Sequence, residues 1–161
     1  MMWNACKFIL LFMLATVCHW AVATLFSFCG ISVNMMLVFA LAFCTVFRQE
    51  FGYPAVFLCG LFLDFFGTKL FGNNAFSFTL AAFMVYLLRE RLDFDGIFTP
   101  FITTLFLTLL VGLLNPLLIQ WFTQSAQWPS VIGLLGGALA GALLAPLVFW
   151  SVRRSFRQKV R

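Results

Sequence analysis

The segment Gly60-Leu-Phe-Leu-Asp64-Phe-Phe-Gly67 places one carboxylate inside an apolar run. The other acidic residues lie in short polar breaks beside arginines or turn residues: Glu50, Glu90, Asp93 and Asp95. A charge in hydrocarbon costs on the order of 3 kcal/mol or more, so it persists only with a partner, a cavity or a proton. The sequence therefore predicts a specific role for Asp64, with Lys69 as its nearest candidate counter-charge.

The composition around this segment predicts a membrane protein. Hydrophobic residues make up 63% of the 161 residues and charged residues 9%, whereas a soluble domain has roughly 45–50% apolar and about 25% charged residues. We therefore expect an all-α polytopic membrane protein with a single integral-membrane domain, 1–161. The formal charge is +5. In a membrane protein the distribution of this charge indicates which side is cytoplasmic, so it does not predict a nucleic-acid partner.

The hydropathy pattern predicts a compact bundle of six transmembrane helices and a basic tail, 153–161. Two of the six segments are only about 14 residues long, which gives ~21 Å of helix against ~30 Å of hydrocarbon. An alternative of four spans plus a re-entrant hairpin, formed by these two segments, stays open; six spans are favoured. The predicted spans are 8–28, 35–47, 53–66, 75–88, 101–122 and 131–152.

The distribution of bases predicts that both termini are cytoplasmic, because cytoplasmic loops carry an excess of Lys and Arg. Six spans with this orientation leave Lys69 alone outside among the ten Lys and Arg residues. The basic tail also suits contact with anionic lipid. The nine bases placed inside are Lys7, Arg48, Arg89, Arg91, Arg153, Arg154, Arg157, Lys159 and Arg161.

Two further patterns concern helix packing. Small residues recur at helical spacing in the last span, which favours close helix approach, within the chain more than with a partner. In the fifth span, Asn115-Pro116 predicts a kink; a kink that lines a substrate path, with Thr103, Thr104 and Thr108, is the alternative. The small-residue stripe consists of Gly133, Gly137, Gly141 and Ala145.

The sequence offers little for catalysis. It has no paired carboxylates, no glycine-rich phosphate loop, no Cys-x-x-Cys pair and a single histidine, His19. Active sites and metal sites require several such groups at defined spacing. We therefore expect a protein that is not an enzyme and that needs no cofactor or metal.

The chain resembles the MreD family of bacterial rod-shape-determining membrane proteins. The resemblance rests on Gly60, Asp64 and Gly72 at the end of a mid-chain span, on Asn34 at the head of the second span, and on length and hydropathy. The chain departs from the family pattern at three places: Val33, where proline is usual, Lys69, and Asn73-Asn74. The departures at Lys69 and Asn73-Asn74 concern the turn after Asp64.

The resemblance implies a non-enzymatic subunit of the bacterial cell-elongation (rod) complex in the inner membrane, which organises lateral peptidoglycan synthesis and cell shape. Its implied partners are MreC, a single-span periplasmic protein, and with it MreB, RodA and the transpeptidase partner of RodA. The implied fold is similar to the S-components of energy-coupling-factor transporters. The alternative function is therefore a substrate-binding subunit of a vitamin-type transporter, with Asp64, Asn34 and Lys69 as polar anchors.

Overall fold

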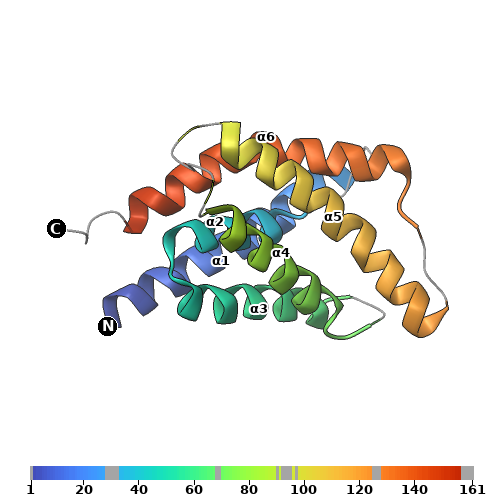
Figure 1. Cartoon of the computed structure of the whole chain (residues 1–161), viewed down its shortest axis with the longest axis horizontal. Coiled ribbons are helices and arrows are strands. Elements are labelled where there is room, and N and C mark those ends of the chain that lie inside the picture. The colour runs from blue at the N-terminus through green and yellow to red at the C-terminus, as the bar shows by residue number, and fades with distance from the viewer. Residues whose placement is uncertain are drawn as a thin grey trace.

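The computed structural model describes residues 2–27, 33–67, 70–89, 91, 96, 98–124 and 128–156. In the first helix, side chains are described only from Ile9 to Leu25. These residues form helices and no β-strand, so the all-α prediction is confirmed. The helices run back and forth between two ends of the bundle (Figure 1). They are α1 (Met2–Ser27), α2 (Met35–Val46), α3 (Gln49–Phe65), α4 (Asn73–Arg89), α5 (Phe98–Thr123) and α6 (Val131–Phe156).

Each predicted apolar segment overlaps one helix of the described residues, and the helices differ in length. Two helices, α5 and α6, are long and apolar enough to cross a membrane, each with 26 residues. The apolar part of α1, Ile9–Leu25, and the helix Met35–Val46 are shorter, and α3 and α4 have 17 residues each. The described residues thus contain the six predicted helical segments, of which two have the length and hydropathy for spanning, and turns divide the middle of the chain into the short helices α2, α3 and α4.

Helix α2 lies at the centre of the bundle. Every residue from Met35 to Thr45 is buried, and α2 packs against each of the other five helices. A helix of 12 residues is only ~18 Å long, so both of its ends lie within reach of side chains from the surrounding helices. An apolar helix that is buried all round is typical of a protein core.

Side chains satisfy both ends of α2. At its start, the Asn34 side chain accepts a hydrogen bond from the Leu37 N–H at 3.2 Å. At its end, Nη1 of Arg89 donates to the carbonyl oxygens of Cys44, at 3.2 Å, and Phe47, at 2.9 Å. The guanidinium meets the negative end of the helix dipole there, which is the favourable arrangement.

Replacement of Arg89 with methionine is expected to lower the free energy of unfolding by about 1–2 kcal/mol, because carbonyl groups at the end of α2 lose a charged donor. The measurement is thermal unfolding of the purified protein in detergent. Arg91→Met is the matched control, since Arg91 is exposed. An equal loss of stability in both variants would show that overall charge, and not the cap, is responsible.

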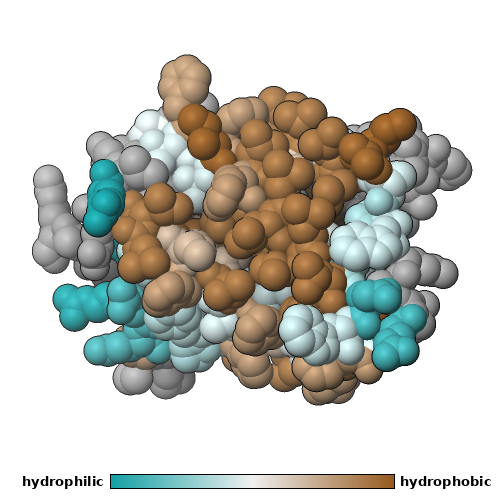
Figure 2. Space-filling view, turned by 45° about the vertical axis from the view of Figure 1, so that its right-hand side comes forward, coloured by the Kyte–Doolittle hydropathy of each residue, from teal (hydrophilic) through white to brown (hydrophobic). Residues whose placement is uncertain are grey.

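The bundle has large apolar side chains on its surface and polar side chains in its interior. One face is largely hydrophobic, with hydrophilic side chains gathered toward its two edges (Figure 2). Large exposed side chains occur on several helices, among them Val17, Phe57, Ile102 and Leu143. In the part of the chain that the structure describes, the buried polar side chains are Thr45, Asp64, Asn73, Asn74, Ser77, Thr103 and Thr104.

The small-residue stripe of α6 faces the interior of the chain. Gly133, Gly137, Gly141 and Ala145 are all buried, and α6 packs on α5 and α2. A Cβ at Gly141 would lie 3.6 Å from Cγ2 of Val38, a normal van der Waals distance, so the two helices are in close contact at this point. The stripe is therefore occupied by helices of this chain along its buried length.

Candidate functional site

Asp64 lies in the last turn of α3 and is 5% exposed. Its Oδ1 accepts a hydrogen bond from the Asn74 N–H at 3.0 Å, and its Oδ2 accepts one from the Ala75 N–H at 3.1 Å. Both donors belong to the first turn of α4. The carboxylate of one helix therefore caps the beginning of the next.

The beginning of α4 needs this external cap because it starts from a glycine. The Gly72 carbonyl accepts the first bond of the helix, from the Phe76 N–H at 2.9 Å, so Gly72 occupies the N-cap position. A Ser, Thr, Asn or Asp side chain at that position would normally accept from the second or third helical N–H. Gly72 has no side chain, and its φ of +89° favours glycine.

The charge of Asp64 also suits this position. A carboxylate at the end of α3 is disfavoured by the dipole of its own helix, whereas the first turn of α4 presents positive partial charge to it. The interaction between Asp64 and α4 therefore stabilises the carboxylate in a buried setting. It also fixes the direction in which the chain re-enters the bundle after the turn.

Gly60 lies one helical turn before Asp64 and permits the close approach of α4. A Cβ at this position would lie 2.5 Å from Cα of Ala75 and 2.7 Å from both its nitrogen and the carbonyl oxygen of Asn74. Residues four apart share a helix face, so Gly60 and Asp64 contact the same two residues of α4. The glycine removes the steric barrier and the aspartate supplies the hydrogen bonds.

The same face of α3 packs on α4 at its other end. Gly52 and Val56 continue the row at intervals of four residues, and both are buried. A Cβ at Gly52 would collide with the hydroxyl of Tyr86 near the end of α4. We call the part of this interface around Gly60, Asp64, Gly72, Asn74 and Ala75 the α3–α4 junction.

A chain of side-chain hydrogen bonds joins the junction to α5. Nδ2 of Asn115 donates to Oδ1 of Asn74 at 2.8 Å, and Oγ of Ser77 donates to Oδ1 of Asn115 at 2.6 Å. Helix α5 continues through Pro116, although proline leaves the Gly112 carbonyl without its usual N–H partner. Asn115, which the sequence associated with a kink, therefore also links α5 to α4.

The two other residues predicted as polar anchors have different positions. Asn34 caps α2, so its side-chain oxygen is engaged with the backbone. Lys69 lies outside the described residues, and its pairing with Asp64 stays a prediction. The carboxylate of Asp64 and the amide oxygen of Asn34 each accept from the backbone N–H groups of a helix, which is a structural role.

Sequence reasoning missed the contributions of Asn74, Ser77 and Arg89. Asn74 and Ser77 are three residues apart and thus on one face of a mostly apolar helix, a signal that was present in the sequence. Arg89 was attributed to topology alone, and its contacts depend on where α2 ends. Within the part of the chain that the structure describes, no three His, Cys, Asp or Glu side chains are placed to hold a metal.

The geometry of the site defines a class: a helical bundle in which a buried carboxylate caps a neighbouring helix. Comparison of the chain with family models, curated proteins and solved structures found no match.

Proposed function

We propose that this chain is an integral protein of the bacterial inner membrane, with six helices in the bilayer and both termini in the cytoplasm. The exposed apolar side chains and buried polar side chains of the bundle support insertion. The two helices of spanning length, α5 and α6, support it as well. The shorter helices α2, α3 and α4 then lie within the bundle or cross a locally thinner bilayer.

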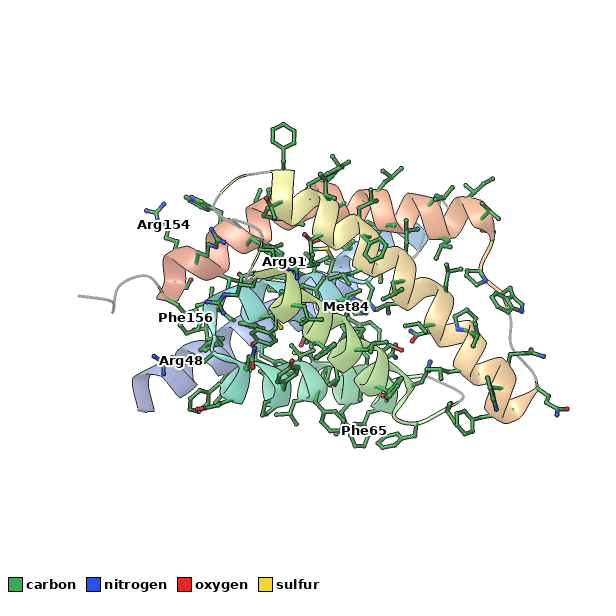
Figure 3. The ribbon with its side chains drawn as sticks, viewed as in Figure 1. Arg48, Phe65, Met84, Arg91, Arg154 and Phe156 are labelled. Carbon is green, nitrogen blue, oxygen red and sulfur yellow. The ribbon has the colours of Figure 1, made fainter. Side chains whose placement is uncertain are left out.

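The orientation is supported by the position of the arginines. Arg48 and Arg154 lie at the end of the bundle where Phe156 ends α6 (Figure 3). Arg89 lies at the same end, because it bonds to the carbonyl of Phe47. With this end in the cytoplasm, the described arginines follow the positive-inside rule.

Within the membrane the protein acts as a non-enzymatic scaffold subunit of the cell-elongation complex, and it binds an MreC-like single-span protein. The observation that carries this proposal is the α3–α4 junction. Gly60, Asp64 and Gly72, the residues on which the MreD resemblance rests, all contribute to one helix junction, and the described bonds of the carboxylate go to backbone N–H groups.

Affinity capture from detergent tests the proposal. Tagged protein, shown to be folded by a single symmetric elution peak, is expected to recover an MreC-like protein expressed with it. An unrelated single-span protein, expressed at the same level, serves as the control. Equal recovery of both proteins, or of neither, would contradict the scaffold function.

A vitamin-type transporter subunit is the second candidate. The observation that favours it is a set of buried polar groups that lack hydrogen-bond partners among the described residues: the amide of Asn73 and the hydroxyls of Thr104 and Thr108. Such groups are satisfied when a polar molecule or water binds. A small solute found with the purified protein by native mass spectrometry, and lost in Thr104→Val, would support this candidate over the scaffold.

A further inference from the structure

Three helix ends meet around Phe47, the residue that follows α2. Its carbonyl oxygen accepts the bond from Arg89, at the end of α4. Its ring lies 4.8 Å from the ring of Phe156, the last residue of α6, in an edge-to-face arrangement. Arg48, directly after Phe47, and Arg154, two residues before Phe156, are therefore brought to the same end of the bundle.

The cations at this end are presented on the surface. Arg48, Arg91 and Arg154 are exposed, and among the residues that the structure describes Glu50 is an exposed acidic side chain in the same region. At the opposite end, the described residues of the turns after α3 and α5 include no Lys or Arg. The described positive charge is thus concentrated at one end.

One face of α6 shows what surrounds these cations. Leu143, Leu147, Trp150 and Arg154 follow one another at helical spacing, and the first three are 69%, 66% and 60% exposed. The guanidinium carbon of Arg154 lies 5.1 Å from the centre of the Trp150 ring, within cation–π range. The exposed face therefore changes from aliphatic to aromatic to cationic along the helix.

This order matches the layers of a bilayer: hydrocarbon, interface and headgroup. Tryptophan prefers the interface, so a membrane that covers Leu143 and Leu147 places Arg154 at the depth of the lipid phosphates. Arginine binds phosphate through two parallel N–H groups. A soluble acidic protein is the alternative ligand for Arg154. Its charged surface would not cover the aliphatic part of the same face, Leu143 and Leu147.

We propose that the Arg48–Arg154 end of the bundle binds the headgroup phosphate of anionic glycerophospholipids, with Arg154, held over Trp150, as the principal ligand. This inference rests on the membrane insertion proposed above and is independent of the protein partner. Arg48 and Arg154 would then bind a lipid phosphate in addition to setting the orientation of the protein in the membrane.

The test is native mass spectrometry of the full chain, released from detergent that contains equal amounts of phosphatidylglycerol and phosphatidylcholine. We expect phosphatidylglycerol to be retained in preference. Arg154→Gln is expected to weaken its retention about fivefold, and Arg48→Gln with Arg154→Gln to weaken it further. Trp150→Leu should weaken it less, because the charge remains. Free glycerol 3-phosphate should not compete, since it lacks the acyl chains that would cover Leu143 and Leu147.

Lys69→Gln is the matched control, because it removes one positive charge from the other predicted side while the basic tail stays intact. Equal retention of the two lipids, or equal losses in Lys69→Gln and Arg154→Gln, would overturn the proposal. The rival ligand for these arginines is an acidic soluble protein. If Arg154→Gln abolishes binding of such a protein and leaves the preference for phosphatidylglycerol unchanged, the proposal is also overturned. Arg154→Gln should still capture the MreC-like protein. If the wild-type protein prefers phosphatidylglycerol but does not capture the MreC-like protein, the scaffold function is refuted and the lipid site is not.

Discussion

Replacement of Gly60 with alanine is expected to destabilise the protein by more than about 3 kcal/mol, because the new methyl group meets backbone atoms that cannot rotate away. The Cβ would lie 2.5 Å from Cα of Ala75 and 2.7 Å from its nitrogen. Relief requires that α4 move away from α3. That movement would lengthen the hydrogen bonds to Asp64, which are already 3.0 and 3.1 Å long, so the steric and polar losses add.

Thermal unfolding in detergent, with yield of monodisperse protein as a second measure, checks this expectation. Gly112→Ala is an informative control, because its methyl group would meet only the end of the Leu134 side chain, which can change rotamer. Gly96→Ala is a second, since nothing described lies within 4 Å of its Cβ. If Gly60→Ala unfolds at the same temperature as these two variants, the close approach of α4 to α3 does not exist in the folded protein.

The sequence allowed the helices and the importance of the Gly60–Asp64 pair to be predicted, because both depend on local patterns. Apolar runs and their polar breaks located six helical segments, and the spacing of four placed Gly60 and Asp64 on one face. Helix ends were less accurate. We expected 53–66 and 75–88, whereas the helices are Gln49–Phe65 and Asn73–Arg89, since polar residues such as Glu50 and Asn73 continue a helix where caps or favourable dipole contacts exist.

The backbone partners of Asp64 in α4 could not be predicted from the pattern. In sequence, Lys69 is the nearest opposite charge, and a buried carboxylate suggests an ion pair. Two donors described for Asp64 are backbone N–H groups, those of Asn74 and Ala75, and every residue type except proline has such a group. Only the path of the chain through Gly72, with its positive φ, brings these donors to the carboxylate. The same reasoning applies to Arg89, whose acceptors are carbonyl groups of α2.

Substitution of Asp64 is expected to reveal a graded loss of stability. Asp64→Ala leaves the two buried N–H groups of α4 without this acceptor, at a cost of about 1–3 kcal/mol each, and should destabilise by roughly 3 kcal/mol or more. Asp64→Asn retains one oxygen and directs an amide NH₂ toward the other donor. It loses one bond and the interaction with the helix dipole, which together cost about 2 kcal/mol. An ion pair alone would make the two variants equal.

Unfolding midpoints of the wild type and the two variants, measured at one detergent concentration, decide between these outcomes. Glu50→Ala controls for the loss of an acidic side chain, because Glu50 is exposed, and it should unfold with the wild type. Capture of the MreC-like protein by each variant, at a temperature where all remain folded, then separates folding from binding. If Asp64→Ala is as stable as the wild type, the carboxylate does not cap α4. If the variant is less stable but still captures the MreC-like protein, Asp64 stabilises the fold and does not contribute to binding. Lost capture in a folded Asp64→Asn would instead place the start of α4 in the partner interface, since the direction of that helix depends on the contact with Asp64 that the variant weakens.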